Sequence, residues 1–384
     1  SSDLVPPYHP DTPKVRKDWA QYHDLITLMD NQVQGILDDL EADGLAEDTI
    51  VVYFSDHGAG MPRSKRWPYD SGIHVPLIVR FPEKYRHLAP AAPGTTLDRL
   101  VSFVDFGPTM LSLAGVPVPE HMQGQPFLGP QATAPRSHIF AGRDRMDERY
   151  DCTRVVRDHR YKYIRNFMPH VPYSQYIEYM YEMPTMQEWQ RLAEAGELNP
   201  AQAAWMAARK PVEELYDTAK DPFEINNLID SAEHREIADR LRARLESWML
   251  DIEDLGLVPE SEMHRRADGR PFMAVADAEE TPLKRALQTA QLERGGNGAI
   301  EELRARLANQ DSVVRFWAAV GLHVLDAKDD GSRRALTEAL GDAAPSTRLA
   351  AAHALAHAGD VTATVPVLAA GLEHESEWVR LRAA

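Results

Sequence analysis

The chain has 384 residues, is 43% hydrophobic and 26% charged, and carries a formal net charge of −17 at pH 7. This length predicts two or three domains with substantial cores. The acidic balance argues against nucleic acid as a partner, because binding it requires a basic face. No apolar run reaches the ~18–20 residues that a membrane span needs. A single cysteine, Cys152, excludes an internal disulfide and a zinc site built of several thiolates.

The amino-terminal part of the sequence predicts alternating helix and strand. A proline-rich lead-in over residues 1–13 precedes apolar residues that recur every three or four positions from Trp19 to Leu40, which predicts an amphipathic helix ending near Gly44. Residues 50–54 and 75–81 predict buried strands, and a short helix is expected over 105–114. This alternation predicts an α/β fold whose mostly parallel or mixed sheet is covered on both faces.

A charged segment follows the first predicted strand. Asp56 and His57 stand at its carboxyl end, the edge at which open α/β sheets bind ligands. Three cations follow within one loop, namely Arg63, Lys65 and Arg66. Together these groups favour a site that holds an anion against a metal ion. A capping aspartate, a surface histidine and a solvated basic turn are the plainer alternative.

A smaller α+β unit with an antiparallel sheet is predicted beyond residue 135. Residues 153–156 and 161–167 predict paired strands, 185–210 is helical, 214–217 predicts a strand and 232–252 a helix. Residues 259–296 are polar and are predicted to include a linker. The domains expected from this reading are 1–135, 136–258 and 297–384, with 259–296 between the last two.

The last part of the chain is rich in alanine, leucine and arginine and contains an internal repeat. Arg315, Arg348 and Arg380 follow similar turns and stand 33 and 32 residues apart. This period is typical of stacked helix pairs. Residues 297–384 resemble a short all-α HEAT-type solenoid, for which a protein partner is expected by analogy. Because the chain ends within the third such helix, the natural protein is expected to continue.

Several stretches, in order, resemble the type I sulfatases of the alkaline phosphatase superfamily. They are Thr49–Gly58 with the following Lys65, Tyr69–Ile78, Phe103–Pro117 with Gln123-Gly124, and Glu214–Leu228. The resemblance covers about residues 1–255 and implies part of an alkaline-phosphatase-like sandwich with a mixed sheet. The segment from Arg157 to Phe167 is most similar to heparan N-sulfatase (sulfamidase) and its bacterial relatives.

This resemblance implies a hydrolase of sulfuric esters or sulfamates, acting on a sulfated sugar or glycosaminoglycan-type substrate and located in the periplasm or secreted. Its nucleophile would be a formylglycine made from a Cys or Ser in a C/S-x-P-x-R motif. One Ca²⁺ ion would orient the sulfate. Asp56 matches a metal ligand, and His57 is expected to bind the metal, a sulfate oxygen or the formylglycine hydroxyl. Lys65 matches the cation that holds the sulfate and stabilises the transition state.

The sequence also departs from the family. No C/S-x-P-x-R motif occurs in the 384 residues, and the paired amino-terminal aspartates of the metal site are missing. We therefore expect the carboxyl-terminal part of a longer sulfatase, with the remaining calcium ligands outside this chain and no activity alone. The alternatives are a phosphodiesterase or phosphonate hydrolase of the same superfamily, or a non-catalytic sulfatase remnant with an interaction solenoid.

Other reactive residues are expected to be structural. Cys152 lacks the neighbours of a modified cysteine and is predicted to be a buried core residue. His74 is expected in the core or at a sheet edge rather than on a substrate. Arg143, Arg145 and Arg149 are expected in a solvated loop, with contact to a sugar as the alternative.

Overall fold

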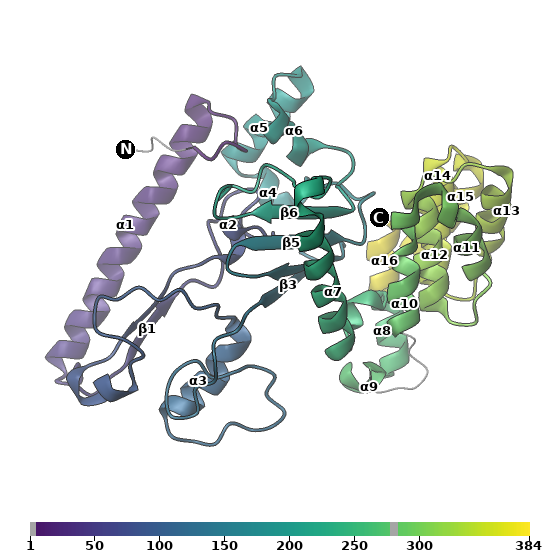
Figure 1. Ribbon diagram of the computed structural model, residues 1–384. Helices are drawn as coiled ribbons and strands as arrows, with labels where there is room; N and C mark the ends of the chain where they lie inside the picture. The colour runs from purple at the N-terminus through teal and green to yellow at the C-terminus, as the bar shows by residue number, and fades with distance from the viewer. Residues whose placement is uncertain (1–4, 277–282) are drawn as a thin grey trace.

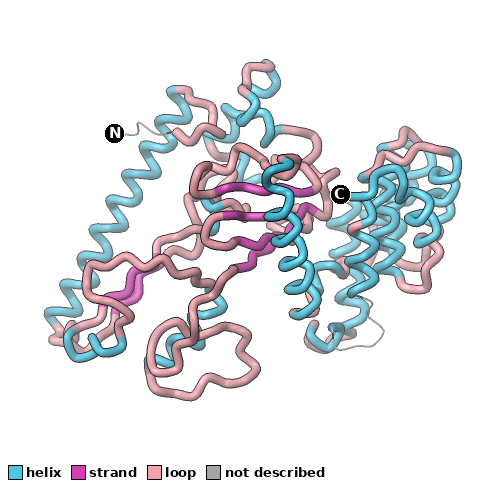
Figure 2. The backbone as a smooth tube through the Cα atoms, in the orientation of Figure 1, coloured by secondary structure: helices cyan, strands magenta, loops and turns pink. Residues whose placement is uncertain are grey.

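The computed structural model describes residues 5–276 and 283–384. In Figure 1 a long helix stands at one side, a small antiparallel sheet lies in the middle and a stack of short helices forms the other side. Figure 2 shows that loops make up much of the region around the amino-terminal strands. Within the described ranges, no helix combines the length and the apolar character needed to cross a membrane.

The long helix, α1 (Pro13–Ala42), starts earlier than its apolar pattern predicts. Thr12 caps it by accepting a hydrogen bond from the Val15 amide at 3.4 Å, and the proline that follows fits a first turn because it needs no amide partner. The chain leaves the helix through Gly44, whose φ of 70° favours glycine. Val15 and Trp19 are the buried residues of α1, so its remaining turns contribute little to the core.

Strands β1 (Val51–Phe54) and β2 (Leu77–Arg80) form a two-stranded antiparallel sheet with Val52 opposite Val79. These two strands are therefore not parallel neighbours, although a mixed sheet can contain such an antiparallel pair. Parallel neighbours need a crossover, usually a helix packed on the sheet. The segment between them contains only the four-residue helix α2 (Asp70–Ile73), which is too short for that role. After β2 come the 3₁₀ helices Glu83–Leu88 and Phe103–Asp105 and the predicted helix α3 (Phe106–Leu113).

The second sheet is antiparallel and confirms the predicted hairpin. Its strands pair in the order β3 (Ile139–Arg143), β4 (Thr153–Arg157), β5 (Tyr161–Asn166) and β6 (Glu213–Asp217). Successive side chains point to opposite faces of a strand. Tyr163 therefore packs on one face against α7 (Arg235–Asp251), while Ile164 faces the other side with Trp67. Helices α4 (Glu178–Tyr181), α5 (Pro184–Ala195) and α6 (Pro200–Met206) lie in the connection from β5 to β6.

The segment predicted as a linker, 259–296, is largely helical where it is described. It contains α8 (Glu260–Ala267), α9 (Met273–Ala276), α10 (Leu283–Ala290) and the start of a 3₁₀ segment, Leu292–Ala299. Leu283 and Leu287 are buried in the same cluster as the sheet residue Tyr163. These helices are short and interrupted, so they show no long apolar period in the sequence. The division at residues 135, 258 and 296 stays a prediction.

The tail consists of paired helices, as the repeat predicts. They are α11 (Ile300–Arg306), α12 (Ser312–Val324), α13 (Asp330–Ala339), α14 (Pro345–His357), α15 (Val361–Leu372) and α16 (Glu377–Ala383). The three repeated arginines, Arg315, Arg348 and Arg380, make the same hydrogen bonds. Each donates hydrogen bonds to the carbonyls five and six residues earlier, at 2.6 to 3.2 Å. The period seen in the sequence thus marks a repeated closure of the turn before a helix.

Candidate functional site

The turn after β1 carries the first two predicted site residues. The Asp56 side chain is 81% exposed and its Oδ2 lies 3.5 Å from Nε2 of His57. The other ring nitrogen of His57, Nδ1, lies 2.7 Å from the Gly58 carbonyl oxygen, to which it donates. In the neutral ring this bond leaves the lone pair on Nε2, beside a carboxylate oxygen. The two side chains can therefore face one bound cation together.

The loop that follows folds back on itself. The Gly58 amide donates to the Gly72 carbonyl at 2.9 Å, and the Lys65 amide donates to the Ala59 carbonyl at 3.0 Å. A Cβ atom at Gly58 would lie 1.8 Å from the Ser71 oxygen, so only glycine permits this approach. The closure brings Lys65, eight positions after His57 in sequence, beside the turn that bears it.

Lys65 is half-buried and its ammonium lies 5.3 Å from the centre of the Tyr179 ring. It makes no ion pair within residues 5–276 and 283–384. Arg66 lies over the same ring at 4.9 Å but is neutralised by an ion pair with Asp147. Of the two cations, Lys65 therefore keeps its charge available for an anion.

Arg63 does not belong to the predicted anion site. Its side chain is buried and its guanidinium lies between the rings of Tyr8 and Tyr69, at 4.3 and 3.8 Å from their centres. It also donates to the Glu224 carbonyl at 2.7 Å. These contacts make Arg63 a packing residue, and the sequence could not show this because its partners lie up to 161 positions away.

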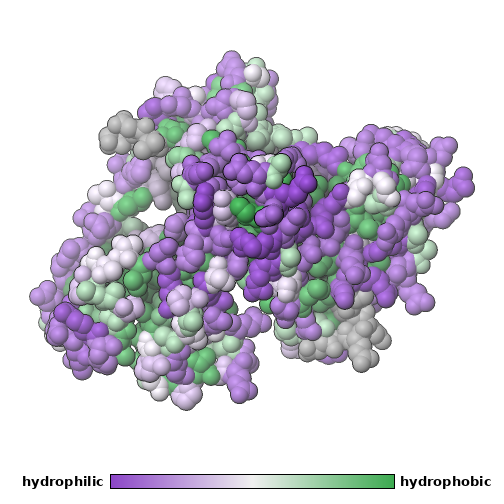
Figure 3. Space-filling model, in the orientation of Figure 1, coloured by the Kyte–Doolittle hydropathy of each residue, from purple (hydrophilic) through white to green (hydrophobic). Residues whose placement is uncertain are grey.

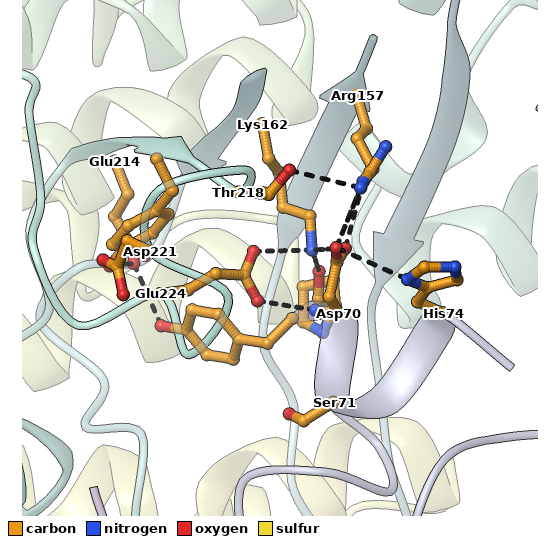
Figure 4. A network of polar contacts seen from close by, with 12 residues as sticks. Asp70, Ser71, His74, Arg157, Lys162, Glu214, Thr218, Asp221 and Glu224 are labelled. Atoms are coloured by element: carbon orange, nitrogen blue, oxygen red, sulfur yellow. Dashed lines mark hydrogen bonds and ion pairs between the residues drawn. The ribbon is translucent and has the colours of Figure 1, made fainter. Parts of the chain in front are cut away.

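A buried network ties the loop to the second sheet (Figure 4). Lys162, fully buried in β5, lies 2.6 Å from Oδ1 of Asp70 and 2.7 Å from Oε1 of Glu224. Arg157 of β4 donates to the same Asp70 carboxylate, and the Asp70 amide donates to Glu224 at 2.6 Å. Because Lys162 and Arg157 point to the sheet face that the loop covers, these contacts fix the loop in place.

The charges in this network shift each other's protonation. Burial would raise the pKa of Asp70, but Lys162 and Arg157 outweigh it and lower that pKa to about 2. For Glu224 burial is the largest cause, and Lys162 offsets it only in part, so its pKa is raised. Asp70 therefore carries a negative charge opposite Lys162 at neutral pH.

The residues present fit only part of a calcium site. Calcium takes six to eight oxygen ligands. Asp56 offers one carboxylate, while the imidazole of His57 offers a nitrogen that this ion disfavours. In the part of the chain that the structure describes, no group of three or more His, Cys, Asp or Glu is arranged to hold a metal ion. A calcium ion at Asp56 would therefore need further oxygen ligands besides this carboxylate.

For the remaining residues, the structure confirms the expected position of one and corrects the positions of others. Cys152 is fully buried, as expected, and burial raises the pKa of its thiol well above the usual value. His74 is not a core residue: its side chain is 74% exposed, 3.8 Å from Asp70. Arg143 is not in a solvated loop, because it ends β3 and is buried over the Trp67 ring at 3.8 Å.

Sequence reasoning missed the buried residues that support the site. The stretches that carry the family resemblance include three of these residues, Lys162, Asp70 and Glu224. The motifs did not predict a function for any of them. One signal was present: a lysine in the interior of a strand whose neighbours are apolar must find a counter-charge if both faces are covered. Which carboxylates supply it is decided only by the fold.

Comparison with known proteins assigns the two parts of the chain. Residues 5–116 match the Sulfatase family model, 62–176 match N-sulphoglucosamine sulphohydrolase, C-terminal, and 300–384 match HEAT repeats. An ulvan-active sulfatase of Formosa agariphila is 45% identical over 259 residues, which are 67% of this chain and 42% of that protein. The human N-sulphoglucosamine sulphohydrolase is 26% identical over 65% of this chain and 51% of its own length.

Among solved structures, a 2-O GAG sulfatase gives a TM-score of 0.42 at 23% identity, covering 59% of this chain and 41% of that one. The chain thus spans about half, or less, of the relatives that it matches. Residues 5–176 belong to the sulfatase family. More particularly, the chain joins sulfatase sequence of the N-sulphoglucosamine sulphohydrolase type to a HEAT-repeat tail. The α/β class, the α+β unit and the all-α tail predicted from the sequence are confirmed.

Proposed function

We propose that this chain is part of a sulfatase that hydrolyses sulfuric esters or sulfamates, and that residues 55–66 form one side of its active site. The observation that carries the proposal is the closure of the 58–72 loop. This closure sets Lys65, half-buried and without an ion pair among the described residues, beside the Asp56–His57 turn. A lysine beside two side chains that can bind a metal ion, Asp56 and His57, can hold the negatively charged oxygens of a sulfate group.

In this site Lys65 binds a sulfate oxygen and stabilises the negative charge that develops as the ester or sulfamate bond breaks. Asp56 supplies a carboxylate ligand to calcium, which when bound would orient the sulfate and offset its charge. His57 holds a proton on Nδ1 through Gly58 and presents Nε2 to the metal or to the substrate. The formylglycine nucleophile comes from a C/S-x-P-x-R segment that these 384 residues do not contain. The chain by itself is therefore expected to release no sulfate.

The proposed substrate is a sulfated carbohydrate. This rests on similarity to proteins named as an ulvan-active sulfatase and an N-sulphoglucosamine sulphohydrolase. The same resemblance supports a periplasmic or secreted location. The HEAT-type tail is proposed to bind a protein partner.

The test joins the chain behind a sulfatase segment that carries C/S-x-P-x-R, taken from the 45%-identical relative. Sulfate release from ulvan and heparan oligosaccharides is then measured by ion chromatography, with the 384-residue chain alone as reference. Lys65→Ala should lower kcat by roughly 10²–10³-fold, the effect of removing one group that stabilises transition-state charge.

Lys84→Ala is the matched control, because Lys84 is exposed and distant in sequence from the loop. Equal rates for Lys65→Ala and Lys84→Ala would contradict the role of Lys65. Hydrolysis of phosphonate monoesters or phosphodiesters in preference to sulfates would favour the phosphoryl-transfer alternative. Sulfate release by the 384-residue chain alone would contradict the proposal that it contains only one side of the active site.

A further inference from the structure

Two exposed tyrosines lie at the loop that carries Lys65. All 13 tyrosines belong to the described ranges, and only Tyr176 and Tyr179 are exposed, at 53% and 50%. Hydrophilic side chains, purple in Figure 3, predominate on the face drawn there. A large aromatic ring left in water on such a surface is a candidate for contact with a ligand.

The turn at helix α4 holds these two rings on its outer side. Ile177 and Met180 are buried in the same apolar cluster as Trp67 of the 58–72 loop. Tyr176 and Tyr179 each precede one of these buried residues and remain exposed. Burial of the inner pair therefore fixes the tyrosines against the loop that bears the proposed sulfate-binding lysine.

The loop between β3 and β4 holds the same segment. Nε of Arg149 donates to the Tyr176 carbonyl at 2.6 Å, and the Glu178 amide donates to Oε1 of Glu148 at 2.9 Å. These bonds fix the backbone that carries the exposed rings. A surface that is already ordered loses less conformational entropy when a ligand binds to it.

Positive charge lies next to the two rings. The Lys65 ammonium lies 5.3 Å and the Arg66 guanidinium 4.9 Å from the centre of the Tyr179 ring. Arg149, which holds the Tyr176 backbone, makes no ion pair in the part of the chain that the structure describes. A ligand on the tyrosines therefore meets two cations, Lys65 and Arg149, that no described carboxylate neutralises. This surface suits a molecule with an apolar face and acidic substituents.

We propose that Tyr176, Tyr179 and Arg149 form a subsite for the sugar chain of the substrate, next to the sulfate group held by Lys65. The inference rests on the proposed function and names residues that select an acidic oligosaccharide over a small sulfate ester. The C–H face of a sugar ring packs on the electron-rich face of tyrosine. Arg149 binds an acidic group of the sugar chain, a carboxylate or a second sulfate.

The experiment titrates the 384-residue chain with sulfated tetrasaccharides prepared from ulvan and from heparan, and measures binding by calorimetry. Tyr176→Ala and Tyr179→Ala should each weaken binding about tenfold, as expected for the loss of one stacked ring. Tyr179→Phe keeps the ring and should keep the affinity. Tyr85→Ala is the matched control, because Tyr85 lies beside Lys84 on a separate 3₁₀ helix, and it should bind like the wild type.

Arg149→Gln tests the contact with an acidic group, using the same tetrasaccharides with native and with reduced uronic carboxylates. It should weaken binding of the native forms about tenfold, because a charged hydrogen bond is lost. A carboxylate is the partner if the substitution has no effect on the reduced forms, and a sulfate is the partner if it weakens both equally. Equal affinities of wild type and Arg149→Gln for the native forms would overturn the role of Arg149.

The subsite is overturned if no tetrasaccharide binds the chain, or if Tyr176→Ala and Tyr179→Ala bind as tightly as Tyr85→Ala. It is also overturned if the two tyrosines mediate a dimer of this chain, seen by sedimentation. The protein joined to the C/S-x-P-x-R segment separates this inference from the proposed function. Tyrosine-dependent binding without sulfate release by that protein supports the subsite and counts against the proposed function. Sulfate release that is equal in all three tyrosine-to-alanine variants has the opposite meaning.

Discussion

At the scale of single residues, the support beneath the candidate site matters as much as the residues that face substrate. Lys162 is fully buried and holds carboxylates from two segments that lie 92 and 62 positions away, Asp70 and Glu224. A buried ion pair contributes little net stability over an apolar replacement, but removing one partner leaves the other charge stranded. Lys162 thus couples the position of the loop to the integrity of the sheet.

We predict that Lys162→Met destabilises the chain by about 3–5 kcal/mol, because Asp70 and Glu224 lose the ammonium between them while still buried. The free energy of unfolding from urea titration, followed by circular dichroism at pH 7, measures this. Lys84→Met is the control, since that lysine lies at the surface. A similar small change in the free energy of unfolding in both variants would show that the contacts of Lys162 do not stabilise the chain.

At the scale of elements, the 58–72 loop and helix α2 depend on two close backbone approaches. Besides Gly58, Gly72 packs so tightly that a Cβ atom there would lie 2.2 Å from the carbonyl oxygens of Ser64 and Trp67. Those carbonyls belong to the loop that carries Lys65. The geometry of the candidate site is therefore built on backbone contacts that only glycine allows.

Gly72→Ala should destabilise the chain by about 1–3 kcal/mol, because the loop must shift to accept the methyl group. It should also speed amide exchange at Gly58 and Lys65, whose hydrogen bonds close the loop. Thermal melting and hydrogen-exchange mass spectrometry measure the two effects. Gly60→Ala, in the same loop with nothing within 4 Å of its added Cβ, should change neither. If both variants behave alike, the loop tolerates the added volume.

At the scale of the whole molecule, a row of histidines joins the sheet to the helical tail. The ring of His323 on α12 lies 4.4 Å from that of His170, after β5, and 4.9 Å from that of His357 on α14. Burial, reinforced by the nearby His357, lowers the pKa of His323 to about 3. The other titratable or charged groups that act on this row are His353, Arg209, Lys210, Arg382 and Asp326.

The lowered pKa of His323 makes the contact between the sheet and the helical tail sensitive to acid. The unfolded chain binds a proton at His323 near pH 6.5 while the folded chain does not, so stability falls as the pH drops from 6.5 toward 3. His323 contributes about 1.4 kcal/mol per pH unit over this range. Glu293, whose pKa burial raises to about 7, acts in the opposite direction between pH 7 and 4.5. The effects of His323 and Glu293 on stability can be separated by comparing the wild type with a variant that changes one of these residues.

We predict that His323→Phe, which keeps an aromatic ring in the row, removes one histidine's share of the acid dependence. The stability of the wild type relative to this variant should fall by about 1.4 kcal/mol for each pH unit below 6.5. Urea titrations at pH 7, 6 and 5 measure it. His121→Phe, at an exposed position, should leave the acid dependence of the wild type unchanged. Parallel curves for the wild type and His323→Phe would contradict the prediction.

Much of the fold followed from local patterns. The α1 period, the 153–167 hairpin, the β6 strand, the α7 helix and the arginine repeat are all set by side chains a few positions apart. The antiparallel pairing of β1 with β2 and the helices of the supposed linker were not predicted. Pairing direction depends on what covers a sheet, and short interrupted helices leave no long apolar period.

The sequence by itself determined the family, the Asp56, His57 and Lys65 candidates and the division into a sulfatase part and a repeat tail, because each is written in contiguous motifs. Only the tertiary structure decided that Arg63 is a packing residue, that Lys65 keeps a free charge among the described residues, and that Lys162 anchors the loop. The same holds for the apolar side of α1, which is exposed among residues 5–276 and 283–384. The physical reason is that the roles of charged side chains follow from their partners and their burial, and here both come from residues far apart in the chain.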